Sequence, residues 1–219
     1  MKLHWSPRSP FVRKVMIVLH ETGQIGGVQY VRNPVAMSEP NATVMADNPL
    51  GKIPTLVLDN GEVLFDSHVI SEYFDRRHSG AKLFPAEQEA YFRALTWQAL
   101  GDGLLENLLL WRNWATERGL DPLAGADAYT RAFALKTGTT LDRLESVASE
   151  LDAAPFNIGH VTIGTMLSYL DFRWPKLEWR TGRTRLAGWH ERFERRPSVM
   201  ATGITNDDTL PVAAKGHSA

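Results

Sequence analysis

The chain has 219 residues, of which 43% are hydrophobic and 22% are charged, values that are ordinary for a globular protein. Lysine and arginine number 24 against 25 aspartate and glutamate residues, and the formal charge of −1 excludes a strong field for nucleic acid or an anionic membrane. The absence of cysteine excludes disulfides, thiolate metal sites and a thiol nucleophile of the protein itself.

Targeting and metal signals are weak along the whole sequence. The first ten residues lack the apolar run of a signal peptide, and no apolar segment approaches the roughly 18 residues of a membrane span. The seven histidines are scattered without the spacing of metal ligands. The basic segment 179–198 is interleaved with glutamates, as on a solvated helix face. We therefore expect a cytoplasmic protein with no metal and no membrane or nucleic-acid partner.

The first third of the chain predicts alternating strands and helices. We expect a strand over Lys2–Trp5, followed by a helix whose apolar residues recur at helical spacing until Gly23. A second strand is expected over residues 28–32, before a polar, irregular stretch. The result is a compact α/β beginning to the fold.

A β-hairpin and a helix are expected next. Residues 55–58 and 62–65 are apolar and flank an Asp-Asn-Gly turn signal, which predicts two antiparallel strands. Ser67 then caps a helix that should end at Gly80. This hairpin and helix complete the expected α/β part.

From about Glu87 onward the pattern becomes helical throughout. Helical periodicity covers residues 89–119 and 127–153, and residues 162–174 predict a helix that is buried on nearly all sides. The sequence therefore divides into an α/β domain over residues 1–79 and an all-helical domain over residues 88–219.

Ser9 stands where the first helix starts, directly before Pro10. This pair is typical of a helix N-cap and first position, so a structural role alone would explain it. A helix N-terminus also favours a nearby anion, and a serine hydroxyl can accept from the backbone while it donates its own proton outward. Either reading fits the residues, and the two roles are compatible.

Two later motifs also have a structural and a functional reading. Pro54 in "GKIPT" is either a trans proline that opens an edge strand or a cis proline that exposes the Ile53 backbone to a peptide-like ligand. Asp66 and Ser67 lie at a strand-to-helix junction. They either cap the helix or hold the ammonium and carboxylate groups of an amino acid.

Taken in order, these motifs resemble the glutathione S-transferase family. The resemblance rests on "SPF" at residues 9–11, "NPLGKIP" at residues 48–54 and Asp66-Ser67. The later segments "GTMLSYLDFRW" and "GWHERFERRPS" are similar to the helical region of small bacterial members, so the likeness covers nearly the whole chain.

The resemblance implies an α/β thioredoxin-like N-terminal domain that binds glutathione, with a cis peptide bond at Pro54, followed by an all-α C-terminal domain. Ile53 would pair with the cysteinyl backbone, and Asp66 with Ser67 would hold the γ-glutamyl group. Ser9, or a backbone N–H beside it, would face the thiol, and Ser6 is a weaker rival. Phe11 and Lys52 would lie near the ligand.

A second reactant and a second subunit also follow from the resemblance. The helical domain would supply an apolar pocket for a small electrophile, and we expect four residues to line it: Phe11, Leu105, Leu109 and Trp111. Glutathione would be a co-substrate, in a detoxifying transferase that forms a homodimer.

Three departures from the family pattern shape this expectation. Ser9 stands where omega-like members carry cysteine, which disfavours disulfide reduction, and theta-like members place their serine one position earlier, at Arg8 here. The usual capping aspartate of the C-terminal core helix is expected to be replaced by Thr165, after Thr162. Asp66 replaces a commoner glutamate and shortens a ligand contact.

The leading hypothesis is a glutathione transferase that conjugates the glutathione thiolate to small apolar electrophiles. A zeta-like isomerase, in which glutathione adds and leaves without net consumption, is an alternative. The other alternative is a non-catalytic member that binds glutathione or a protein partner, because a fold does not determine a function.

Overall fold

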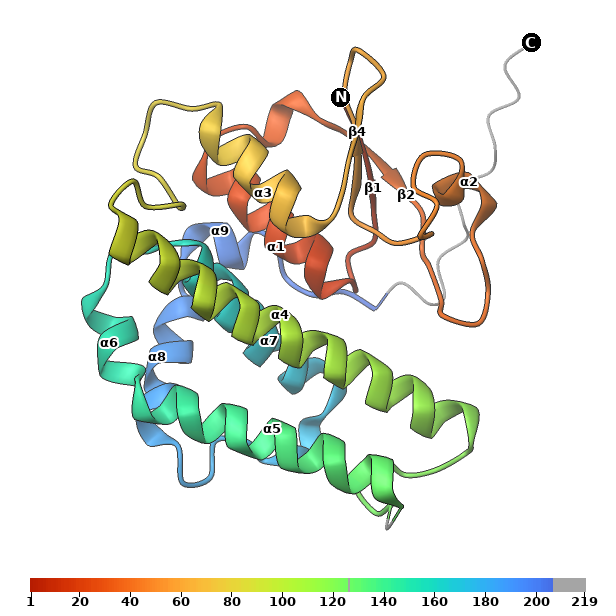
Figure 1. Ribbon diagram of the computed structural model, residues 1–219, viewed down its shortest axis with the longest axis vertical. Coiled ribbons are helices and arrows are strands. Elements are labelled where there is room, and N and C mark those ends of the chain that lie inside the picture. The colour runs from red at the N-terminus through yellow and green to blue at the C-terminus, as the bar shows by residue number, and fades with distance from the viewer. Residues whose placement is uncertain (126, 207–219) are drawn as a thin grey trace. The chain divides into compact units, whose positions relative to one another are not determined.

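A computed structural model describes residues 1–125 and 127–206, which form two compact units. The first unit comprises Met1–Lys82 together with the described residues after Met200, and the second comprises Leu83–Met200 (Figure 1). Residues 207–219 of the expected second domain lie outside the described residues.

The first unit is built around a four-stranded mixed sheet. Its order is β2-β1-β3-β4, with β2 parallel to β1 and the other neighbours antiparallel. The strands are β1 (Lys2–Trp5), β2 (Gln29–Arg32), β3 (Thr55–Val57) and β4 (Val63–Leu64). The helices are α1 (Pro10–Glu21), α2 (Ala42–Met45) and α3 (Ser67–Arg76), with a short 3-10 turn, η1, at Ile25–Gly27.

The core of this unit joins the sheet to α1 and α3, which lie side by side (Figure 1). Leu3 and Leu56 in the sheet, Val15 in α1, and Ile70 and Phe74 in α3 are all fully buried. Ile70 and Phe74 are four residues apart and therefore lie on the same face of α3. The predicted thioredoxin-like α/β domain is confirmed by this arrangement.

Two predictions about helix ends in the first unit are wrong. Asp66, not Ser67, is the N-cap of α3, because its Oδ1 accepts the His68 N–H at 2.9 Å. The helix ends at Arg76 rather than Gly80, since the ammonium of Lys82 donates to the Asp75 carbonyl at 2.6 Å and satisfies the last turn. In addition, the polar stretch expected to be irregular contains the short helix α2.

The second unit is helical in every regular element that the structure describes. It contains α4 (Gln88–Glu117), α5 (Ala128–Ser146), α6 (Ala148–Ala153), α7 (Ile158–Arg173), the 3-10 turn η2 (Pro175–Leu177), α8 (Thr184–Glu194) and α9 (Pro197–Met200). The predicted all-α C-terminal domain is thereby confirmed. The single helix expected over residues 127–153 is interrupted at Val147, where the chain turns so that α6 packs against α8.

Helix α7 forms the centre of this unit and packs closely on α4. Every residue from Ile158 to Leu170 is buried, whereas Asp171 is exposed and Phe172 and Arg173 are half-buried, so the burial expected over residues 162–174 is interrupted in the last turn. Glycines permit the close approach: a Cβ at Gly159 would lie 2.6 Å from the Trp97 Cβ, and one at Gly101 would lie 2.8 Å from Thr162 Cγ2. Larger residues at either glycine would push the two helices apart.

The start of α7 corrects another prediction. The helix begins at Ile158, so Thr162 and Thr165 lie inside it and do not replace the cap. The cap is Asn157, whose Oδ1 accepts the Gly159 N–H at 3.0 Å, while the Asn157 N–H donates to His160 Nδ1 at 3.1 Å. Asparagine and histidine thus form the reciprocal capping box of this helix.

After Met200 the chain contacts the first unit again. Arg13 Nε donates to the Thr202 carbonyl at 2.9 Å, and the Thr205 N–H meets the Pro7 carbonyl at 3.5 Å. A few residues from the C-terminal side of the chain therefore pack beside α1 and the loop that precedes it.

Candidate functional site

Strand pairing in the first unit brings the three predicted ligand-binding segments to one end of the sheet. His4 pairs with Thr55 across the antiparallel β1–β3 ladder, so the loop after β1 and the segment before β3 lie at the same end. Leu56 pairs with Leu64, which turns the end of β4 and the start of α3 to that end as well. Ser9, Ile53 and Asp66 therefore occupy the same edge of the fold.

Ser9 caps helix α1 with a single bond. It is half-buried, and its Oγ accepts the Val12 N–H at 3.3 Å, which is long for a hydrogen bond. Because the hydroxyl accepts in this contact, its own proton remains available to donate. The rival Ser6 is buried, and its carbonyl accepts the Ser9 N–H at 3.1 Å.

The loop before β3 contains a cis proline. The Ile53–Pro54 peptide bond is cis, as the resemblance implied. The Ile53 side chain packs with Val12 and Val44 in one buried cluster, which fixes it against the first turn of α1. Among residues 1–125 and 127–206, no hydrogen bond engages the N–H or carbonyl of Ile53. This backbone can pair with an extended ligand in the manner of an added strand.

Asn48 holds this loop in place, and the sequence interpretation did not assign it a role. Its buried side-chain amide donates to the Lys52 carbonyl at 3.3 Å and to Thr55 Oγ1 at 2.9 Å. Thr55 Oγ1 in turn donates to the same carbonyl at 2.7 Å. The Lys52 side chain is exposed. The position of Asn48 six residues before Pro54 was the one signal that could have identified it.

A buried histidine supports the segment in front of Asn48. Asn33 Nδ2 donates to His4 Nδ1 at 2.8 Å, so His4 carries its proton on Nε2 and donates it to Asp47 Oδ2 at 2.7 Å. Hydrogen bonds from Lys2 and then from His4 lower the pKa of Asp47 below its ordinary value. Strand β1 is thereby tied to the segment that carries the cis proline.

Asp66 and Ser67 open helix α3 at the same end of the sheet. Asp66 is exposed, and its Oδ1 is engaged by the cap while Oδ2 has no partner among the described residues. Ser67 is 3% exposed and begins the first turn, where helix N–H groups point outward. The pair presents a carboxylate next to a partially positive helix end, which suits a ligand with both an ammonium and a carboxylate.

The residues expected to line the electrophile pocket belong to both units. Phe11 is half-buried in the first unit, whereas Leu105, Leu109 and Trp111 lie on α4 of the second. Leu105 is 0% exposed and Trp111 is 1% exposed, and the Trp111 ring lies 4.4 Å from that of Trp174. These contacts belong to the core of the helical unit. That the four residues line a pocket stays a prediction.

Within residues 1–125 and 127–206, no group of three or more histidine, aspartate or glutamate side chains is arranged to hold a metal ion. In the same residues, no helix combines the length and the apolar character that crossing a bilayer demands.

Each of the two units matches a model of a known protein family. Residues 3–82 match the family model described as "Glutathione S-transferase, N-terminal domain", and residues 127–192 match "Glutathione S-transferase, C-terminal domain". Among curated proteins, the chain is 31% identical over 206 residues to the "Uncharacterized GST-like protein YibF" of Escherichia coli K12, with 92% of this chain and 98% of that protein covered.

Solved structures are similar over almost the same length. A glutathione transferase family member from Pseudomonas fluorescens Pf-5 with bound glutathione is 40% identical, has a TM-score of 0.87, and is matched over 94% of this chain and 99% of its own. A glutathione S-transferase from Methylobacillus flagellatus, also with glutathione bound, is 29% identical with a TM-score of 0.80, over 93% and 99% of the two chains.

Proposed function

Because the chain belongs to the glutathione S-transferase family, we propose that it is a cytoplasmic enzyme that conjugates the glutathione thiolate to small apolar electrophiles. The observation that carries the proposal is the Ile53 backbone, which follows a tightly held loop and makes no hydrogen bond with any described residue. It offers one donor and one acceptor to the cysteinyl residue of glutathione. The two relatives with glutathione in their structures support this ligand.

The start of α3 would hold the γ-glutamyl end of the tripeptide. The exposed Asp66 carboxylate attracts the ammonium group, and the first turn with Ser67 accepts the carboxylate. The strand register places this turn at the same end of the sheet as Ile53. A tripeptide held at these two points leaves its thiol toward the start of α1.

Ser9 would stabilise the thiolate. A thiol with a pKa near 8.5 is only about 3% ionised at pH 7, and a decrease of roughly 2 units requires about 2.7 kcal/mol. One charge-assisted hydrogen bond supplies about 1.5–3 kcal/mol, and the helix dipole adds up to about 1 kcal/mol. The Ser9 hydroxyl proton and the α1 N-terminus are thus sufficient to make the thiol mostly ionised.

The ligand part of the proposal is tested by calorimetry with reduced glutathione. We expect saturable binding, and we expect Asp66→Asn to weaken it about tenfold, as loss of one ion pair in a half-open site would. The same variant should not weaken binding of cysteinylglycine, which lacks the γ-glutamyl group. Glu62→Gln, which removes an exposed carboxylate at the other end of β4, serves as the control. Absence of any heat with millimolar glutathione would contradict the proposal.

The catalytic part is tested by turnover of a general chloroaromatic acceptor. Glutathione should be consumed in a one-to-one ratio with the acceptor. Glutathione recovered unchanged after turnover of an isomerisable substrate would favour the isomerase instead. Binding without activity on a broad set of electrophiles would favour a non-catalytic member. Sedimentation equilibrium tests the homodimer that we expect from the family.

A further inference from the structure

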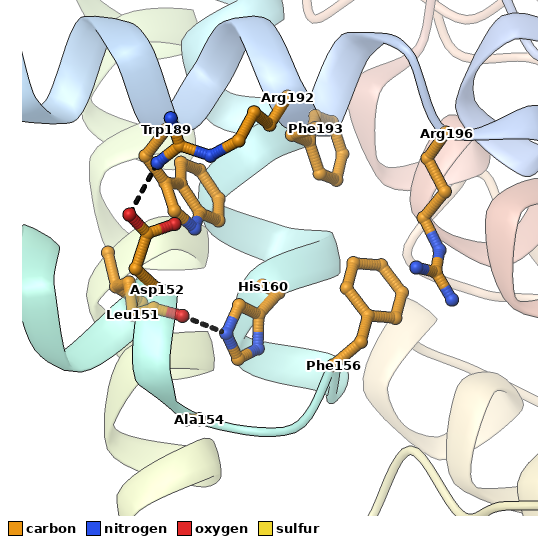
Figure 2. Close-up of a pocket in the computed structure, with 9 residues that line it drawn as sticks. All are labelled: Leu151, Asp152, Ala154, Phe156, His160, Trp189, Arg192, Phe193 and Arg196. Atoms are coloured by element: carbon orange, nitrogen blue, oxygen red, sulfur yellow. Dashed lines mark hydrogen bonds and ion pairs between the residues drawn. The ribbon is translucent and has the colours of Figure 1, made fainter.

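The pocket between the end of α6, the start of α7 and helix α8 contains polar side chains that already have partners (Figure 2). Arg192 pairs with Asp152, and His160 Nε2 donates to the Leu151 carbonyl. The Ile53 N–H is different, because no described residue accepts a hydrogen bond from it. A backbone donor without a protein acceptor needs water or a ligand. The residues that aim this donor therefore influence which ligand binds.

The carbonyl that precedes the Ile53 N–H is held by two donors. Thr55 Oγ1 donates to the Lys52 carbonyl at 2.7 Å, and Asn48 Nδ2 donates to it at 3.3 Å. Thr55 is 0% exposed and Asn48 is 1% exposed, so both donors lie inside the fold. A carbonyl oxygen has two lone pairs, and both are used here. The Lys52 carbonyl is therefore fixed toward the interior.

The two donors have no freedom of their own. Asn48 Nδ2 also donates to Thr55 Oγ1 at 2.9 Å, so the hydroxyl accepts from Asn48 and gives its single proton to Lys52. Asn48 Oδ1 accepts the Leu50 N–H at 3.0 Å, and the Asn48 N–H donates to the Val44 carbonyl at 2.8 Å. Each hydrogen of the side-chain amide thus has an acceptor, and the arrangement of the two residues is closed.

The geometry of the peptide unit carries this constraint to Ile53. The Lys52–Ile53 peptide bond is trans, because the cis bonds of the described residues are those before Pro54 and Asp66. In a planar trans peptide unit, the carbonyl and the N–H point in opposite directions. Since the Lys52 carbonyl points toward its two buried donors, the Ile53 N–H points away from them.

We propose that Thr55 and Asn48 are positioning residues for the ligand. By holding the Lys52 carbonyl, they aim the Ile53 N–H at the carbonyl of the cysteinyl residue of glutathione. This inference rests on the proposed function, in which the Ile53 backbone pairs with that residue. It adds a requirement on the ligand: a thiol that lacks a carbonyl next to its thiol-bearing residue should bind more weakly than glutathione.

The experiment compares two ligands by calorimetry on the full chain. Reduced glutathione is paired with γ-glutamylcysteamine, which keeps the γ-glutamyl group, the amide N–H and the thiol but lacks the cysteinyl carbonyl and the glycine. We expect Thr55→Val to weaken glutathione about tenfold, because one hydrogen bond loses its alignment, and γ-glutamylcysteamine by less than about twofold. The missing glycine affects both proteins alike and cancels in the comparison of the four affinities. Equal losses for the two ligands would overturn the proposal.

Two further variants separate positioning from a general disturbance. Thr55→Ser keeps the hydroxyl and should bind both ligands within about twofold of the native chain. Thr22→Val is the matched control, because Thr22 is a buried threonine of the same unit whose Oγ1 donates to the Val18 carbonyl at 2.8 Å, at the far end of α1 from Ser9. A tenfold loss of glutathione binding in either variant would overturn the role assigned to the Thr55 hydroxyl.

A measurement on the native chain keeps the proposal testable if Thr55→Val does not fold. The Ile53 amide proton should shift downfield when glutathione binds, and by much less when γ-glutamylcysteamine binds. Absence of heat with glutathione would contradict the proposed function itself. Binding of glutathione without a shift of the Ile53 amide proton would leave that function standing and overturn only the aim assigned to Thr55 and Asn48.

Discussion

The starts of α1 and α7 use the same backbone groups in different ways. At α7, the Asn157 side chain accepts from Gly159 and His160, and the His160 ring returns a bond to the Asn157 N–H. At α1, Ser9 Oγ accepts a single bond of 3.3 Å from Val12, and the residue is only half-buried.

The difference between the two starts lies in reciprocity and burial. A reciprocal, buried cap uses its polar atoms completely and contributes to stability. A single, half-buried cap leaves a hydroxyl proton and a partially positive helix end for a ligand. Capping residues of similar chemistry can therefore serve stability at one helix and binding at another.

Removal of the Ser9 hydroxyl at the start of α1 should produce the largest of the expected effects, a loss of catalytic turnover. We expect Ser9→Ala to raise the thiol pKa of bound glutathione and to decrease turnover at pH 7 roughly 10- to 30-fold. The deficit should shrink as the pH rises above the raised pKa, because the thiolate then forms unaided. The pH–rate profile and thiolate absorbance measure both effects. Ser6→Ala is the control, and a larger loss in that variant than in Ser9→Ala would reassign the role to Ser6.

Removal of the cap at α7 should affect stability and leave the chemistry intact. We expect Asn157→Ala to decrease the free energy of unfolding by about 2 kcal/mol, because two N–H groups in a buried turn lose their acceptor. Urea unfolding measures the change, and glutathione turnover per folded molecule should not alter. Asn41→Ala at the cap of the short helix α2 should cost less than about 1 kcal/mol. Equal losses of unfolding free energy in Asn157→Ala and Asn41→Ala would show that burial does not determine how much a cap contributes to stability.

The histidine of the α7 cap should make stability depend on pH. Burial lowers the pKa of His160 below its ordinary value, the nearby Arg196 adds to this, and the Leu151 carbonyl and Asp152 oppose it. The unfolded chain therefore takes up the proton first. The contribution of His160 to the free energy of unfolding is complete above a pH of about 6.5 and is lost as the pH falls toward the pKa of the folded state. The loss is at most about 1.4 kcal/mol for each unit by which the folded and unfolded pKa values differ.

His160→Gln tests this dependence without removal of the cap. A glutamine amide can accept from Asn157 and donate to Leu151 but does not titrate, so urea unfolding between pH 7 and pH 5 should vary less than in the native chain. His20→Gln, at the far end of α1, is the control. An unchanged pH dependence in His160→Gln would show that the cap histidine is not the responsible group.

The smallest effects are expected at the two threonines inside α7. Thr162 Oγ1 donates to the Ile158 carbonyl at 2.9 Å, whereas the buried Thr165 Oγ1 has no partner among the described residues. Thr162→Val should cost about 1 kcal/mol, and Thr165→Val should be neutral or stabilise by up to about 1 kcal/mol. Thermal unfolding of the pair gives the comparison, and an opposite order would mean that the Thr165 hydroxyl has an unseen partner.

The sequence predicted the part of the fold in which local signals agree. The start of α1 was predictable because Ser9 and Pro10 are a strong pair of cap and first helical residue, and an apolar periodicity follows them. The cis bond before Pro54 came from the order of three motifs, because spacing alone does not determine an isomer. The strand register then placed the predicted ligand residues at one end of the sheet.

The errors have definite physical reasons. Asp66 and Ser67 are adjacent, and both residue types are favoured at a helix N-cap, so the sequence does not indicate which of the two caps α3. The α7 capping box was missed because histidine is an unusual third residue, and its role depends on a buried acceptor nine residues earlier in the chain. The contacts of Asn48 with Lys52 and Thr55, four and seven residues later, could be suspected only from its position six residues before Pro54.

The return of the chain to α1 after Met200 makes the first unit discontinuous in sequence. A fragment that stops at Lys82 would lack the carbonyl of Thr202 and leave the Arg13 side chain without that acceptor, next to the loop that carries Ser9. Separate expression of the two halves should therefore disturb the loop of Ser9, where we propose that the thiol lies, more than the start of α3. A reporter protein fused directly after Met200, in place of the residues that follow, would remove the same hydrogen bond between Arg13 and Thr202.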